Sequence, residues 1–188
     1  MNTPYCLKEQ KFSDSAHAAA ERMVYPAIFP DCVVEYDRQS VGDGGEGRVN
    51  DGEKAIDYVL NIKSKVVYIN QKLTFTVQER WRRPKTDKGF NVLNANDITI
   101  TATNPTGARS EWEKMQCQWM LYGFYCESTD AILKAYWVDV NLIRWKAVSG
   151  EAGYQFQYGP GPNGRSFQRF YSVPIGLPEV WEIQLDEA

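Results

Sequence analysis

The sequence contains few of the residues that build common metal and redox sites. It has a single histidine, His17, which we expect at the surface or in a capping role rather than as a ligand. Its four cysteines are dispersed and form no CxxC pair: Cys6, Cys32, Cys117 and Cys126. A zinc finger or a histidine-rich zinc site is therefore not expected, and the cysteines are interpreted as free, partly buried thiols.

The chain also lacks a long apolar segment and a large net charge. No run of about 18 apolar residues is present, and residues 1–5 lack the basic-then-apolar order of a signal peptide. We therefore expect a soluble, cytoplasmic protein with no membrane partner. The net charge of −3 gives no overall attraction to nucleic acid, so any such binding must depend on local clusters of basic residues.

Length and composition are those of one globular domain. The 188 residues are 43% hydrophobic and 24% charged, and no repeat or low-complexity tract divides them. We predict a single domain over residues 1–188. Its core is expected at about 13–145, and residues 146–188 are interpreted as a C-terminal extension rich in aromatic residues, glycine and proline.

The first half of the chain predicts a helix followed by strands. Ser13 or Asp14 can cap a helix that continues to Tyr25, where Pro26 ends or kinks it. Extended segments are then expected at 33–36, 55–62, 72–82 and 97–102. The last of these alternates apolar and polar residues cleanly, as a strand with one solvated face does.

A second helix is expected over residues 112–124. Ser110 followed by Glu113 is a capping box, which marks the start of a helix. Apolar residues then follow the spacing of one buried helical face: Trp112, Met115, Trp119 and Tyr122. A strand over 131–140 follows. This order of elements predicts an α/β fold of the α+β type, with a central mixed sheet flanked by helices.

Polar side chains interrupt two of the predicted strands. Asp57 lies near the start of the strand at 55–62. The strand at 72–82 carries four charged or amide side chains: Gln78, Glu79, Arg80 and Arg82. Burying an ion in a strand is costly unless the ion is paired or bound to a cation. The two strands together therefore predict a polar site on the sheet, with metal-assisted chemistry.

This order of elements and these residues resemble the PD-(D/E)XK nuclease superfamily, also called the restriction-endonuclease-like fold. That family has an αβββαβ core with a carboxylate on the first helix, an aspartate on a central strand and a (D/E)-x-K pattern on the next strand. The matching positions are Glu21, Asp57 and the segment from Gln78 to Arg80, and the resemblance covers residues 13–145. It implies a metal-dependent nuclease acting on DNA, with Mg²⁺ or Mn²⁺ as cofactor and a homodimer as a possible assembly.

The resemblance also implies a division of roles. Glu21, Asp57, Gln78 and Arg80 would be catalytic, and a metal-bound water would attack the phosphodiester. Glutamine replaces the usual second carboxylate, but its carbonyl oxygen can still coordinate a hard cation. Arginine replaces the usual lysine. It can hold a phosphate and stabilise an anionic transition state, but it does not deprotonate and so cannot act as a base.

The register of this strand decides which side chain joins Asp57. Two-residue spacing puts Gln78 and Arg80 on one face and Glu79 on the other. The metal ligands would then be Asp57 and Gln78. A β-bulge that shifts the register by one residue would bring Glu79 into the site in place of Gln78.

Each of these residues also has a purely structural interpretation. Asp57 could be a strand-end aspartate paired with a nearby arginine. Gln78 and Arg80 could lie on the solvated face of an antiparallel strand. Glu21 could be a solvated carboxylate on its helix, and Glu35 competes with it for the role of the helical acid.

Two groups of basic residues suit a phosphate backbone. Arg82, Arg83 and Lys85 follow the polar strand, and arginine side chains match phosphate oxygens well. Arg165 and Arg169 lie among aromatic residues beside a glycine-rich loop, a combination common on nucleic-acid-binding surfaces. The alternatives are an ordinary solvated connection for the first group and aromatic residues that close the core for the second.

Three functions are compatible with the sequence. The first is a metal-dependent DNA nuclease. The second is a catalytically inactive relative of the same fold that binds nucleic acid, motivated by Gln78 and Arg80. The third is an assembly protein whose aromatic C-terminal region is an interaction surface.

Overall fold

The computed structural model describes residues 4–39, 54–65, 72–85, 93, 96–103, 109–160 and 169–185, and all statements below concern these residues. For residues 4–6, 157–160 and 169–170 only the backbone is described. The described helices are α1 (Pro4–Ile28), α3 (Glu111–Lys114) and α4 (Val140–Ser149).

The main sheet of the described chain has six strands in the order β1-β2-β3-β5-β6-β9. Its strands are β1 (Cys32–Arg38), β2 (Tyr58–Ser64), β3 (Lys72–Arg82), β5 (Trp119–Cys126), β6 (Ala131–Asp139) and β9 (Val180–Glu182). The neighbours β3 and β5 are parallel, whereas the other neighbouring pairs are antiparallel. The predicted mixed sheet with helices is therefore confirmed.

A second, three-stranded sheet has the order β4-β8-β7. Its strands are β4 (Asp97–Thr103), β7 (Gln157–Pro160) and β8 (Arg169–Pro174). The strand predicted at 97–102 is thus confirmed, although it lies in this smaller sheet. Within 146–188, which was interpreted as an extension, β7 and β8 belong to the smaller sheet and β9 to the main sheet, so the described part of this region is integral to the fold.

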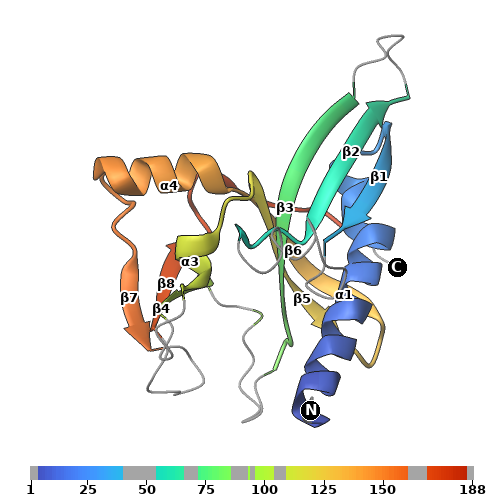
Figure 1. The fold of residues 1–188 in the computed structure, drawn as a ribbon, viewed down its shortest axis with the longest axis horizontal. Coiled ribbons are helices and arrows are strands. Elements are labelled where there is room, and N and C mark those ends of the chain that lie inside the picture. The colour runs from blue at the N-terminus through green and yellow to red at the C-terminus, as the bar shows by residue number, and fades with distance from the viewer. Residues whose placement is uncertain are drawn as a thin grey trace.

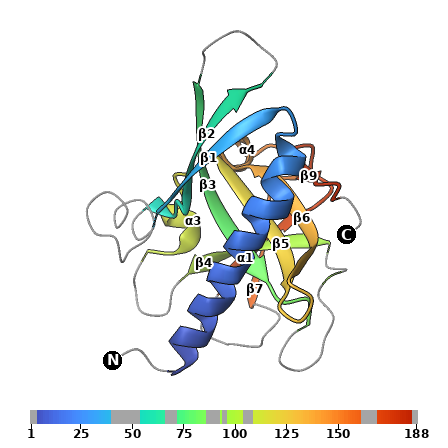
Figure 2. The ribbon, with the colours of Figure 1, turned by 90° about the vertical axis from the view of Figure 1, so that its right-hand side faces the viewer.

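Other elements lie on both sides of the main sheet (Figure 1), and its central strands β5 and β6 are largely buried. Helix α1 runs diagonally across one face, as Figure 2 shows. The smaller sheet, α3 and α4 lie on the opposite side. Two hydrophobic clusters fill the two layers: one holds Ala19, Val24 and Leu121, and the other holds Ile98, Met120 and Val173. Neighbouring residues of β5 therefore enter different cores, as alternation along a strand requires.

The helix predicted over 112–124 is wrong. Its capping box at Ser110 and Glu113 is present, but α3 ends at Lys114 and the chain then forms strand β5. The reason is that β5 lies between β3 and β6 and is buried on both faces, so it reads as a continuous apolar run rather than an alternating one. Such a run has no periodicity that separates a buried strand from a helix.

The first helix is longer than predicted. It spans Pro4–Ile28, so Ser13 and Asp14 lie inside it rather than at its N-cap, and Pro26 lies in its last turn. Ser13 and Asp14 instead use their side chains to bind neighbouring groups, His17 and Arg38. Proline is tolerated near the end of the helix because little of the hydrogen-bond ladder follows it.

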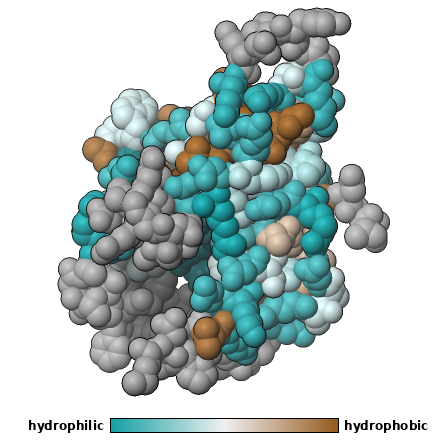
Figure 3. All heavy atoms as spheres, turned by 45° about the vertical axis from the view of Figure 1, so that its right-hand side comes forward, coloured by the Kyte–Doolittle hydropathy of each residue, from teal (hydrophilic) through white to brown (hydrophobic). Residues whose placement is uncertain are grey.

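Among the coloured residues in Figure 3, hydrophilic ones predominate, and apolar ones lie in small groups between them. The exposed large apolar residues of the described chain are Leu7, Val33, Leu73, Leu133, Leu142, Trp145, Val148 and Trp181. None of the described helices has the length and apolar character needed to cross a membrane.

Candidate functional site

Asp57 and Gln78 lie side by side at the junction of β2 and β3. Asp57 was predicted inside a strand, near its start, but it immediately precedes β2, and its amide donates to the carbonyl of Val77 on β3. Its Oδ2 atom accepts hydrogen bonds from Gln78 Nε2 at 2.8 Å and from the backbone amide of Glu79 at 2.7 Å. The carboxylate therefore extends the pairing of the two strands beyond the start of β2 and holds the Gln78 side chain beside it.

The turn that leads into Asp57 has a strained backbone. Ala55 has a φ of 51°, in the left-handed region that non-glycine residues rarely adopt. Its neighbour Lys54 accepts a hydrogen bond from the amide of Gln116, at 2.8 Å, in the segment between α3 and β5. This contact ties the start of β2 to the end of α3 and fixes where Asp57 projects.

Arg80 lies two residues after Gln78 and contacts the other side of this junction. Its guanidinium forms an ion pair with Glu111, the first residue of α3, and its Nη2 lies 3.5 Å from Thr101 Oγ1 on β4. Glu111 Oε2 also accepts from the backbone amide of Thr101 at 3.1 Å. Arg80 and Glu111 are largely but not fully buried, with 17% and 14% of their side chains exposed.

Two polar atoms on this face of β3 are buried without a hydrogen-bond partner in the described structure. They are the carbonyl oxygen Oε1 of Gln78 and the Nε–H group of Arg80. A buried acceptor or donor left unpaired costs about 1–3 kcal/mol, so each such atom calls for an explanation. One is suited to a cation and the other to an anion, and both lie near the carboxylate of Asp57 or Glu111.

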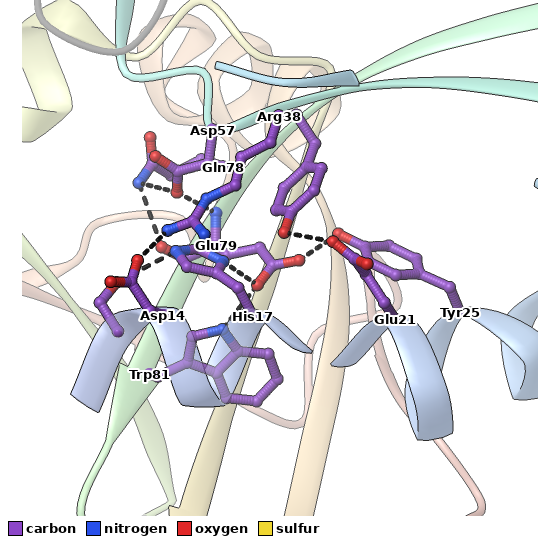
Figure 4. Close-up of polar contacts among 11 residues, drawn as sticks. Asp14, His17, Glu21, Tyr25, Arg38, Asp57, Gln78, Glu79 and Trp81 are labelled. Atoms are coloured by element: carbon purple, nitrogen blue, oxygen red, sulfur yellow. Dashed lines mark hydrogen bonds and ion pairs between the residues drawn. The ribbon is translucent and has the colours of Figure 1, made fainter. Parts of the chain in front are cut away.

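Glu79 points to the opposite face, toward α1 (Figure 4). Its side chain is fully buried, and three donors bind its two oxygens: His17 Nδ1 at 2.6 Å, Trp81 Nε1 at 2.6 Å, and the Tyr25 hydroxyl. The pairing of β3 with β5 keeps an unbroken register through this position, where Glu79 lies opposite Leu121. No bulge therefore rotates Glu79 toward Asp57, and we do not assign Glu79 as a metal ligand.

His17 is buried in this second polar cluster, contrary to the expected surface position. Burial lowers the pKa of His17, but the hydrogen bond and the charge of Glu79 outweigh it and raise the pKa above its ordinary value. Burial and the neighbouring carboxylate of Glu79 also raise the pKa of Tyr25 well above its usual range, so its hydroxyl stays protonated and donates.

Ser13, His17 and Glu79 are connected in the order of a serine hydrolase relay. Ser13 Oγ lies 3.0 Å from His17 Nε2, while Nδ1 faces the carboxylate. However, Ser13 lies within the long helix α1, where neighbouring backbone amides are engaged in helical hydrogen bonds and cannot form an oxyanion hole. We interpret the cluster as the anchor that fixes α1 to β3.

Glu21 belongs to the α1 side of the sheet and not to the Asp57–Gln78 pair. Its Oε1 accepts from the Tyr58 hydroxyl at 2.7 Å, and Tyr58 is fully buried in the core beneath α1. In Figure 4 the Glu79–His17 pair lies between Glu21 and Asp57. Glu35, the competing acid, pairs with Lys63 and Lys72 at the exposed edge of the sheet. The structure therefore brings neither glutamate to Asp57.

Two of the basic side chains predicted to bind nucleic acid are already bonded to other residues of the protein. Arg82 donates to Thr99 Oγ1 at 2.7 Å, and burial lowers its pKa. Arg83 pairs with Glu9 and Glu127. Lys85 is exposed. Arg165 lies outside the described residues, and for Arg169 only the backbone, in β8, is described.

Sequence reasoning missed Glu111 and the role of His17. Glu111 looked like an ordinary acid in the first turn of a helix, where it complements the helix dipole. The charge of Arg80 within a strand indicated that an acidic partner must exist. The sequence did not identify that partner, because Glu111 lies 31 residues away in another element. His17 lies on the same helical face as Ser13 and Glu21, and this polar stripe was the signal that His17 takes part in a polar cluster.

The oxygen ligands near Asp57 are few. Within the part of the chain that the structure describes, no three histidine, cysteine, aspartate or glutamate side chains come together as a metal-binding group. A divalent cation at this junction would instead use the carboxylate of Asp57 and the unpartnered carbonyl oxygen of Gln78. Both are the hard oxygen ligands that Mg²⁺ and Mn²⁺ prefer.

A shallow depression of the described surface lies elsewhere. It has a volume of about 450 Å³ and is lined by aromatic and polar side chains that include Phe75, Trp119 and Trp145. None of the predicted site residues lines it. The depression and the Asp57–Gln78 junction are therefore separate features.

Comparison of the chain with protein-family models, with curated proteins and with solved structures finds no match in any of the three.

Proposed function

We propose that this protein is a divalent-cation-dependent phosphodiesterase that acts on DNA, and that its site is the junction of Asp57, Gln78 and Arg80. The observation that carries the proposal is the pair of unpartnered buried atoms on one face of β3. Gln78 Oε1 is suited to a cation beside the Asp57 carboxylate, and Arg80 Nε–H is suited to an anion. A cation and an anion held side by side are what a metal–phosphate complex requires.

The topology supports the same proposal. An antiparallel β1-β2-β3 arrangement is followed by a crossover to β5, which is parallel to β3. With α1 in front, this order resembles the αβββαβ core of the restriction-endonuclease-like fold. The departure is α3, which has four residues where that core has a full helix. The positions of Asp57 at the start of β2 and of Gln78 and Arg80 on β3 fit that family's pattern.

The residues divide the work as follows. Asp57 and Gln78 would hold the cation through their oxygens, and Asp57 in turn is fixed by the backbone amide of Glu79. Arg80 would bind and neutralise a non-bridging phosphate oxygen, and it cannot take a proton because it is always charged. A bound divalent cation supplies Lewis-acid polarisation of the phosphate and lowers the pKa of a coordinated water. Glu21 is left out of this arrangement.

The direct test is cleavage of plasmid and linear DNA with added Mg²⁺ or Mn²⁺. We expect the wild-type protein to cleave and Asp57→Asn to lose at least about a hundredfold in rate, because Asp57 supplies the negative charge of the Asp57–Gln78 pair that holds the cation. Asp37→Asn, at an exposed aspartate near the end of β1, is the matched control and should keep wild-type activity. Equal cleavage by Asp57→Asn and the wild type would remove Asp57 from the mechanism.

One observation favours a second function, a nucleic-acid-binding module without catalysis. Gln78 turns its amide nitrogen toward Asp57, and Arg80 is paired with Glu111, so the polar groups partly satisfy one another. Under this alternative, DNA binding weakens as salt concentration rises and does not depend on added metal. Metal-independent binding with no cleavage by the folded wild type would favour this module over the enzyme.

A further inference from the structure

Glu111 lies at the junction but has no part in the proposed site as described so far. It comes from α3, and its Oε2 atom accepts from two donors, Arg80 and the amide of Thr101. The side chain is 14% exposed, so it lies at the edge of the buried region and solvent reaches it. No other described residue forms an ion pair with Arg80.

Two backbone hydrogen bonds hold the segment after α3 beside Asp57 and strand β3. The Gln116 amide donates to the carbonyl of Lys54, and the Gln118 amide donates to the carbonyl of Thr76. Between them lies the buried thiol of Cys117, whose environment includes the backbone of Gln78 and the charges of both Asp57 and Glu111. Glu111 and Asp57 therefore flank the same small region from two different elements.

The charge of the proposed cation site is incomplete without Glu111. Asp57 contributes one negative charge and Gln78 contributes none, whereas sites for small divalent cations commonly combine carboxylates with substrate phosphates. Glutamine at position 78 removes the carboxylate that the resembled pattern has on this strand. A carboxylate from α3 would restore it from a neighbouring element.

We propose that Glu111 is the second carboxylate of the site, held by Arg80 in the resting protein and transferred to a divalent cation when Arg80 binds a phosphate. The exchange needs no covalent step. Arg80 gives up one carboxylate oxygen and gains phosphate oxygens, which match its guanidinium, while Glu111 gains the cation. The unpartnered Nε–H of Arg80 is the donor already available to begin this exchange. The inference rests on the proposed function.

The exchange predicts how the Mn²⁺ affinities of three variants rank against the wild type, and these affinities can be measured without DNA cleavage. Glu111→Gln should bind Mn²⁺ about tenfold more weakly than the wild type, because an anionic ligand is lost. Arg80→Gln should bind Mn²⁺ more tightly than the wild type in the absence of DNA, because Glu111 is no longer held. In the double variant, Arg80→Gln with Glu111→Gln, the tighter Mn²⁺ binding of Arg80→Gln should disappear. Free Mn²⁺ is measured by electron paramagnetic resonance, and circular dichroism confirms folding.

The matched control is Glu113→Gln, which lies on the same short helix and keeps the capping box because glutamine also serves there. It should bind Mn²⁺ as the wild type does. If Asp57→Asn loses Mn²⁺ binding and Glu111→Gln does not, the role of Glu111 is refuted while the proposed function stands. If no variant differs from the wild type, or the wild type binds no Mn²⁺, both proposals fail.

Discussion

At the scale of single residues, the neighbours Gln78, Glu79 and Arg80 occupy quite different environments. Gln78 and Arg80 face the junction with α3 and β4, whereas Glu79 is enclosed beneath α1. The two-residue period of a strand predicted this separation correctly. It could not show that both faces are covered, because the covering elements α1 and α3 come from distant parts of the sequence.

The Glu79 carboxylate should be essential for stability. Glu79→Gln keeps the size of the side chain but removes the charge that pairs with His17. The three donors of the cluster then compete for the single carbonyl oxygen of the glutamine. Breaking a buried pair in this way costs about 3–5 kcal/mol, so we expect a loss of that order in the free energy of unfolding. Urea denaturation followed by fluorescence measures it.

The comparison for this experiment is Glu35→Gln, which removes a carboxylate that pairs with lysines at the exposed edge of the sheet. Exposed ion pairs contribute little, so its unfolding midpoint should stay close to that of the wild type. Equal effects of the two substitutions would show that Glu79 does not anchor the fold.

At the scale of elements, α1 is attached to the sheet by both apolar packing and the polar cluster. Ala16, Ala19 and Ala20 let the helix approach closely, and His17 and Tyr25 reach Glu79 from the same face. This mixture explains why the sequence suggested only an ordinary helix. The position of His17 on one helical face marks a polar stripe, but it does not identify the buried partner until the strand beneath the helix is known.

The attachment of α1 should weaken as the pH rises. The pKa of His17 is raised in the folded protein, so its charged form contributes stability that is fully present below its unfolded value of about 6.5. That contribution is lost as the pH increases through the raised pKa. We therefore expect the difference in unfolding free energy between the wild type and His17→Gln to shrink from pH 6 toward pH 9. A constant or growing difference would contradict the ion pair.

Strand β5 shows the limit of periodicity at this scale. Its aromatic run reads equally well as one face of a helix, and only its place between β3 and β6 decides for a strand. The close approach of Gly123 to Trp81 is a local consequence: an added Cβ would lie 2.5 Å from the Trp81 ring and 2.7 Å from the carbonyl of Lys134.

At the scale of the whole molecule, the proposed site lies where the main sheet, the smaller sheet and α3 meet. Asp57, Gln78 and Arg80 come from the main sheet, Thr101 from the smaller one and Glu111 from α3. The sequence predicted the main-sheet part because those residues interrupt strands. It could not predict the rest, because the second sheet forms only when β8, far along the chain, pairs with β4 on one side and with β7 on the other.

The most direct test of the account is the position of Mn²⁺ in crystals of the wild-type protein grown with the ion, located by anomalous scattering. The account predicts one peak at the junction, within about 2.0–2.6 Å of a carboxylate oxygen of Asp57 and of Gln78 Oε1. A fully occupied Mn²⁺ elsewhere in the molecule, with none beside Asp57, would contradict it.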